Sequence, residues 1–175
     1  MEIKANNLSL RNMGKAVVSG AIFSCAIGRK TALVGPEGSG KKITLLMLGG
    51  FLKPSSGSIA ADGEDIGRSL GKYREKVGIG AIDRINPLSE ELTVRENIGF
   101  ALEIIGKKHG RGEIGGILGD FKMDAFADTP VKDLAPLQAA VASAACALAA
   151  DPGIVILDEP TKRLMSADTD IFWEI

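Results

Sequence analysis

The feature that most constrains this chain is a glycine-rich segment, GPEGSGKK, at residues 35–42. The apolar run that precedes it, residues 30–34, predicts a buried strand. The apolar stretch that follows it, residues 43–48, predicts a short helix that stops at Gly49-Gly50. A strand, a loop of this kind and a helix, in that order, are the context of a phosphate-binding loop, or P-loop. Its glycines let backbone N–H groups turn toward one anion, and the helix start adds the positive end of its dipole.

The P-loop hypothesis assigns phosphate binding to a continuous set of residues, in which the Lys41 ammonium adds a full charge for the outer phosphates. The predicted nucleotide-binding residues of this segment are Gly35, Pro36, Glu37, Gly38, Ser39, Gly40, Lys41, Lys42 and Ile43. The alternative interpretation, a plain glycine-rich turn, is weaker because four fixed positions and both flanking elements agree.

One position departs from the P-loop pattern. The Ser or Thr whose hydroxyl holds Mg²⁺ is replaced by Lys42, and an ammonium cannot be a metal ligand. Thr44 is not a ready substitute, because two residues along a helix rotate a side chain by about 200°.

Length, charge and residue counts exclude several classes of function. The 175 residues predict one domain, with room for a small subdomain. A net charge of −1, from 21 basic and 22 acidic residues, argues against a nucleic-acid partner. One histidine, His109, and two distant cysteines, Cys25 and Cys146, exclude a Cys/His zinc site and favour a reducing compartment. The longest apolar run, residues 139–150, is shorter than the ~20 residues that span a bilayer, so no direct membrane insertion is expected.

The remaining pattern alternates strands with helices, which predicts an α/β fold with a mostly parallel sheet. Strands are expected at residues 2–10, 16–27, 57–61, 77–82 and 153–157, and helices at 93–105, 135–150 and 167–175, with a loop or weak helix at 106–119. Thr93 and Glu96 form a capping-box pattern. The apolar face of that helix comprises Val94, Ile98, Ala101, Leu102 and Ile105.

Several single residues also carry expectations. Cys146 is expected in the core and His109 in solvent. Phe172 and Trp173 are expected to mark a partner surface or to pack against elements beyond this chain.

Three further segments carry a family resemblance: LKPSSGSI at 52–59 followed by Asp62-Gly63, LTVRENI at 92–98, and DP followed by IVILDEPT within 151–161. With the P-loop, they are similar to the nucleotide-binding domain of ABC (ATP-binding cassette) transporters. The resemblance runs nearly end to end and implies an ABC-type P-loop NTPase fold. In that fold a mostly parallel core sheet is joined by an N-terminal antiparallel β subdomain and a helical subdomain at approximately 85–140. Residues 1–175 would then be one ABC-type ATP-binding domain, expected to be C-terminally truncated and to lack the last strands and the switch histidine.

The resemblance also implies a function. Two such domains sandwich ATP and drive transmembrane transporter subunits, so the expected location is cytoplasmic, at the inner face of the membrane through these partners. Asp158 would hold Mg²⁺, and the catalytic Glu159 would polarise the attacking water.

Several family positions are altered in this chain. The signature, expected as Leu-Ser-Gly-Gly-Gln, aligns with residues 134–138, where Pro136 lacks an N–H and Leu137 is bulky. Arg84 aligns with the Q-loop glutamine and is a further predicted nucleotide-binding residue. Met165 aligns with the D-loop aspartate, and Met13 or Asn12 with the aromatic residue that stacks on adenine. These changes predict impaired hydrolysis, a doubtful need for Mg²⁺, and pairing with a competent second ABC domain as a heterodimer.

Three functional hypotheses remain open from the sequence. The first is a working ABC ATPase subunit, and the second is a degenerate domain that binds nucleotide without turnover and acts as a structural or regulatory partner. The third, a non-transport ABC ATPase, is disfavoured because nothing in the chain is strongly basic.

Overall fold

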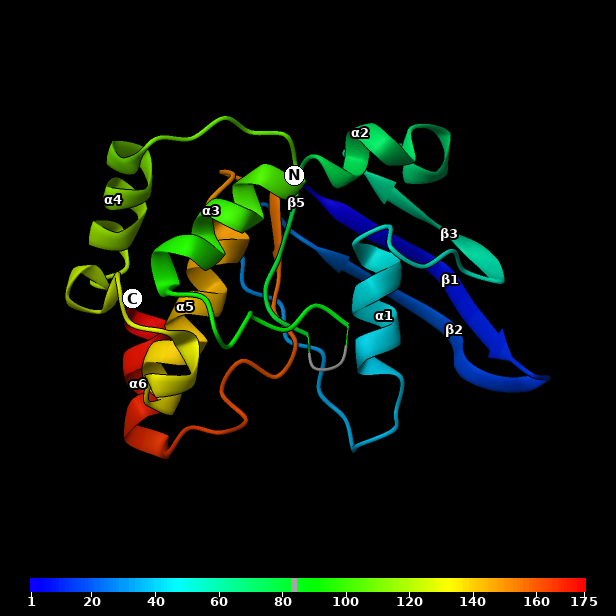
Figure 1. Cartoon of the computed structure of the whole chain (residues 1–175). Coiled ribbons are helices and arrows are strands. Elements are labelled where there is room, and N and C mark those ends of the chain that lie inside the picture. Colours follow the sequence, from blue (N-terminus) through cyan, green and yellow to red (C-terminus); the bar gives the residue numbers. More distant parts are fainter. Residues whose placement is uncertain (83–84) are drawn as a thin grey trace. The chain divides into compact units, whose positions relative to one another are not determined.

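The computed structural model describes residues 1–82 and 85–175 (Figure 1). The chain divides into two compact units, Met1–Val77 and Gly78–Ile175. The P-loop segment belongs to the first unit, and the DEPT segment belongs to the second. The division of residues 1–175 into a single domain with a helical subdomain at 85–140 stays a prediction.

A four-stranded sheet forms most of the first unit. Its strands are β1 (Ile3–Asn12), β2 (Lys15–Cys25), β3 (Ser56–Ala61) and β4 (Glu64–Asp65), in the order β2-β1-β3-β4 with antiparallel pairing throughout. The β1–β2 hairpin turns at Met13-Gly14, where both φ angles are positive, as a two-residue hairpin turn requires. The predicted antiparallel N-terminal sheet is therefore confirmed.

The helices of the first unit are α1 (Lys41–Leu48), α2 (Leu70–Arg74) and a short 3₁₀ turn, η1 (Ile66–Arg68). The C-terminal end of α1 is tied to α2 by two side chains. The Tyr73 hydroxyl donates to the Leu48 carbonyl at 2.5 Å, and Arg74 donates to the Gly50 carbonyl at 2.8 and 2.6 Å. Burial raises the pKa of Tyr73 to about 12, so this hydroxyl stays a donor at physiological pH.

The strand predicted at residues 30–34 is not formed. The run lies in irregular backbone, and the Val34 side chain is 92% exposed. A central parallel strand needs hydrogen-bonded neighbours on both sides. Neither of the two sheets in the described part of the chain includes this run.

The described residues of the second unit form four α-helices and a strand pair, whose first strand begins one residue before the unit. The strands are β5 (Val77–Ile79) and β6 (Ile154–Ile156), which form a two-stranded sheet. The helices are α3 (Val94–Ile104), α4 (Arg111–Asp120), α5 (Pro136–Leu148) and α6 (Ser166–Glu174), with 3₁₀ turns η2 (Asp124–Phe126) and η3 (Val131–Asp133). Of the loop or weak helix expected at 106–119, the structure forms the helix, α4, at Arg111–Asp120.

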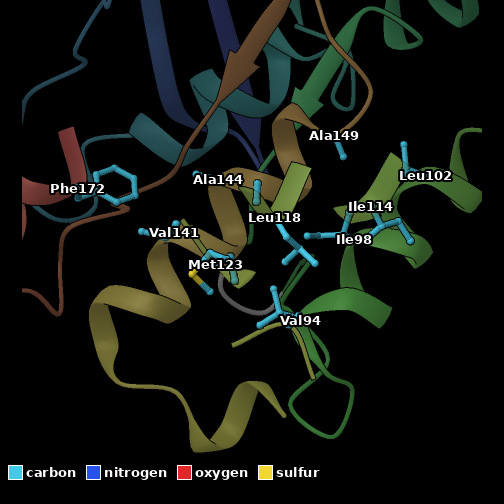
Figure 2. Packing of buried hydrophobic residues seen from close by; sticks show 13 residues of the cluster. Val94, Ile98, Leu102, Ile114, Leu118, Met123, Val141, Ala144, Ala149 and Phe172 are labelled. Carbon is cyan, nitrogen blue, oxygen red and sulfur yellow. The ribbon is translucent and has the colours of Figure 1, made fainter. Parts of the chain in front are cut away.

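The core of the second unit is built from α3, α4 and α5 (Figure 2). Val94, Ile98 and Leu102 of α3 are fully buried, as the helical period predicts. The alanine-rich α5 packs directly on β5, because a Cβ added at Gly78 would overlap the Ala147 carbonyl oxygen. Small side chains on α5 therefore leave room for a close approach of two backbones.

The N-terminus of α3 is held by two polar contacts. Thr93 and Glu96 form the predicted capping box, in which each side chain accepts from the backbone N–H of the other. The Arg95 guanidinium binds the Asp128 carboxylate at 2.8 and 3.3 Å. These hydrogen bonds hold the pKa values of Glu96 and Asp128 below their ordinary range.

Three single-residue expectations are wrong. The His109 side chain is only 19% exposed and lies 3.5 Å from the Glu103 carboxylate, because its ring packs beside Gly99, where α3 has no side chain. Ile105 follows the last turn of α3 and is 43% exposed, so it leaves the buried face. Phe172 is buried in the core of this unit, because α6 packs on α5.

Candidate nucleotide-binding site

The segment at residues 35–40 forms an exposed loop that leads directly into α1. Within it, the Ser39 N–H donates to the Pro36 carbonyl at 3.2 Å, which closes a turn. Gly38 and Gly40 have φ angles of +78° and +87°, a region that favours glycine. A Cβ at Gly40 would also lie 2.7 Å from the Val17 carbonyl oxygen on β2. Glycine at position 40 is therefore required by both backbone conformation and space.

Gly40 is the N-cap of α1, and as a glycine it caps the helix with no side chain. The first N–H groups of any α-helix lack partners within the helix, and they form the positive end of its dipole. The Lys41 ammonium lies at the same place: it donates to the carbonyl oxygens of Gly35 and Pro36, at 2.9 and 3.0 Å. The loop thus folds its lysine back over its own backbone, where a phosphate would meet both kinds of donor.

The residues that follow Lys41 do not fit a magnesium site. Lys42 brings an ammonium to the position where a hydroxyl would ligate the metal. The Thr44 hydroxyl is already engaged, because it donates to the Gly40 carbonyl at 3.0 Å, and the residue is buried. Among the residues that the structure describes, no group of three or more His, Cys, Asp or Glu is arranged to hold a metal ion. Asp158 is the one carboxylate predicted for this role, and it is half-buried just after β6.

The end of β6 places two acidic residues in succession. The strand is fixed by a hydrogen bond from the Gly80 N–H to the Ile156 carbonyl at 3.0 Å. Glu159 is more exposed than Asp158 and has a φ of +47°, which is uncommon for a residue with a side chain. Its carboxylate lies 2.8 Å from the Lys162 ammonium. Lys162 was not predicted from the sequence. A lysine three residues after Glu159, with a proline between them, is nevertheless a pattern that could have indicated a turn with an ion pair.

Residues 134–138 occupy the start of α5. Ala135 is the N-cap, without a side-chain hydrogen bond, and Pro136 is the first helical residue. The Gln138 Oε1 atom is buried and, within the described residues, has no hydrogen-bond partner. This helix start therefore lacks both the hydroxyl and one of the N–H groups that the family pattern would provide.

The other aligned positions are dispersed over the two units. Met13, at the tip of the β1–β2 hairpin beside Asn12, is 98% exposed. Met165 is the N-cap of α6 and is 80% exposed. Arg84 lies outside the described residues.

A glycine loop whose lysine folds back over it, and a separate strand followed by Asp-Glu, together define a P-loop nucleotide-binding domain. The family model described as ABC transporter matches residues 18–162. The chain therefore belongs to the ABC transporter family, as its motifs predict.

Curated relatives carry the name Nod factor export ATP-binding protein I. The protein from Burkholderia orbicola (strain AU 1054) is 32% identical over 174 residues, which cover 98% of this chain and 57% of that protein. The protein from Paraburkholderia xenovorans (strain LB400) is 34% identical over 166 residues, covering 91% of this chain and 53% of that protein. The chain thus spans somewhat more than half the length of these relatives.

Solved structures give the same fold. The dimeric structure of a bacterial ABC transporter cassette has a TM-score of 0.82 and 27% identity, over 98% of this chain and 80% of that one. A bacterial Atm1-family ABC exporter with ATP bound has a TM-score of 0.81 and 23% identity, over 99% of this chain and 31% of that one. The predicted ABC-type P-loop fold is confirmed. No helix in the described part of the chain is long and apolar enough to cross a membrane.

Proposed function

We propose that this chain is the ATP-binding part of an ABC transporter subunit, which binds ATP at its P-loop, couples it to membrane partners and hydrolyses it poorly. The observation that carries the proposal is the geometry at Gly40 and Lys41, where a glycine that cannot be replaced leads into a helix N-terminus beside an ammonium. The names of the relatives support an ATP-binding role in export.

Nucleotide binding is expected to be weak in the isolated chain. The position expected to stack on adenine is Met13 or Asn12; neither is aromatic, and Met13 is exposed. Stacking of a base on an aromatic ring contributes about 1–3 kcal/mol of binding free energy, and this chain lacks that contribution at this position.

Impaired hydrolysis follows from the start of α5 rather than from the P-loop. In the family arrangement this segment of one domain grips the γ-phosphate bound to the other. Pro136 provides no N–H there, and Ala135 provides no hydroxyl. We infer that the productive assembly is a heterodimer with a competent ABC domain, bound to transmembrane subunits on the cytoplasmic side of the membrane. The second candidate, a domain that binds nucleotide and acts only as a structural or regulatory partner, is favoured if no hydrolysis is measured.

We further propose that nucleotide binds with little need for Mg²⁺. Lys42 and Arg84 align with two side chains that help to hold the metal in the family, and both bring a positive charge. Two cations supply the charge of one divalent ion. Each would also repel a metal placed between them, by about 4 kcal/mol per unit-charge pair at ~4 Å and an effective dielectric near 20.

The proposed function is tested by titrating a fluorescent ATP analogue against the wild-type chain and Lys41→Ala. We expect Lys41→Ala to lose at least about tenfold in affinity, equivalent to about 1.4 kcal/mol. Lys53→Ala, which removes an exposed lysine outside the loop, is the control and should bind as the wild type does. Equal affinity in Lys41→Ala and the wild type would show that the P-loop lysine does not bind the nucleotide, and would contradict the proposed function.

A further inference from the structure

The turn after β6 brings a cation onto the predicted catalytic carboxylate. The Lys162 N–H donates to the Glu159 carbonyl at 3.0 Å and so closes the turn. Pro160, the second residue of the turn, fixes the backbone angle that such a turn needs. Because the first and fourth residues of a turn lie side by side, the Lys162 ammonium reaches the Glu159 Oε2 atom at 2.8 Å.

We propose that Lys162 is a positioning residue that attenuates hydrolysis by holding the Glu159 carboxylate in this ion pair. The inference rests on the ATP-binding function proposed above and concerns the control of that same site. A general base must direct an available oxygen toward the water that it activates. In this turn one carboxylate oxygen is engaged by the ammonium, and the side chain is aimed at its own turn. The low turnover expected of this chain thus has a cause at Lys162 that is independent of the altered start of α5.

The exposure of the pair sets the size of the effect. The Lys162 and Glu159 side chains are 63% and 40% exposed, so water competes with the contact. Exposed ion pairs are weak, and the pair should reduce the rate without abolishing it. Removal of the ammonium is therefore expected to raise the rate of hydrolysis by about two- to fivefold.

The first experiment measures single-turnover ATP hydrolysis with the full chain in excess over ATP. Lys162→Ser should hydrolyse faster than the wild type, and the gain should disappear in the double variant with Glu159→Gln. Lys162→Arg, which keeps a cation in the turn, should remain slow. The matched control is Arg163→Ser, which removes the neighbouring exposed positive charge and should match the wild type.

A second measurement detects the pair without nucleotide. A carbodiimide activates the Glu159 carboxylate, which then forms an amide either with the Lys162 amine or with added glycine ethyl ester. Mass spectrometry of proteolytic peptides distinguishes the two products. In the wild type we expect the internal amide to dominate, and in Lys162→Ser the external adduct. A dominant external adduct in the wild type would overturn the pairing.

Binding of the fluorescent ATP analogue, measured on the same variants, separates the two proposals. Intact binding with no faster hydrolysis in Lys162→Ser would overturn this inference alone. If neither the wild type nor any variant bound the analogue, the proposed ATP-binding function would be overturned. The proposed effect of Lys162 on hydrolysis would then be overturned as well.

Discussion

At the scale of single residues, the chemistry of a side chain here depends on what its local backbone lets it reach. Lys41 and Lys162 are both lysines in exposed segments next to a sequence motif. The first folds over the carbonyl oxygens of its own loop, and the second folds onto a carboxylate. Each contact joins residues that lie close together in the sequence. Both contacts therefore follow from local turns rather than from the packing of distant segments.

Burial controls the reactivity of Cys146. Its thiol packs against the core of the second unit, and burial raises its pKa to about 12. Because the thiolate is the nucleophile, the thiol should stay protonated and inert well below that pH. In a Cys25→Ser variant, which leaves Cys146 as the one cysteine, we expect no reaction with a thiol reagent at pH 8 until urea unfolds the chain. Rapid labelling of the native variant would show that this part of the core is open.

At the scale of elements, the contacts at the N-terminus of α3 make the stability of the second unit depend on pH. The pKa values of Glu96 and Asp128 are held down by hydrogen bonds from Thr93 and Arg95. A carboxyl whose pKa is lower in the folded than in the unfolded state stabilises the fold above its unfolded value, about 4. That stability is lost as the pH falls through the folded pKa.

The test compares urea denaturation at pH 7 and pH 3. We expect the midpoint of the wild type to fall more steeply between these pH values than that of the double variant Glu96→Gln, Asp128→Asn. Glu174→Gln, at an exposed position outside these contacts, is the control. Equal slopes in all three proteins would mean that the two hydrogen-bonded carboxylates contribute nothing to acid sensitivity.

Elements specified by local signals were predicted from the sequence. α1 stops at its glycines, α3 begins at its capping box, and α5 has proline at its first position. The strand expected at 30–34 failed because a strand exists only if other strands pair with it, and that information is not local. α4 was expected only as a loop or weak helix because its four glycines weaken the helical pattern, although Ile114 and Leu118 are buried.

The candidate site was predictable in part for the same reason. The P-loop residues and the Asp158-Glu159 pair stand in contiguous motifs, so the sequence located them. The engagement of the Thr44 hydroxyl by Gly40 and the ion pair at Lys162 depend on turn geometry, and only the structure supplied them.

At the scale of the whole molecule, two copies of the chain are not expected to pair with each other around ATP. Two copies would each present Pro136 and Leu137 to the nucleotide of the other, with few donors for a γ-phosphate. We therefore expect no ATP-dependent homodimer, even in a Glu159→Gln variant that blocks residual turnover. Light scattering with and without ATP measures this directly. A tight homodimer formed on addition of ATP would contradict the proposed heterodimer.

We propose above that this P-loop holds nucleotide through backbone N–H groups and side-chain cations rather than through a metal. The most direct measurement is a calorimetric titration with ATP, once with Mg²⁺ and once with a chelator. We expect the two affinities to agree within about threefold, and Lys42→Ser combined with Arg84→Gln to restore a dependence on Mg²⁺. A gain of tenfold or more on adding Mg²⁺ to the wild type, about 1.4 kcal/mol, would contradict the claim.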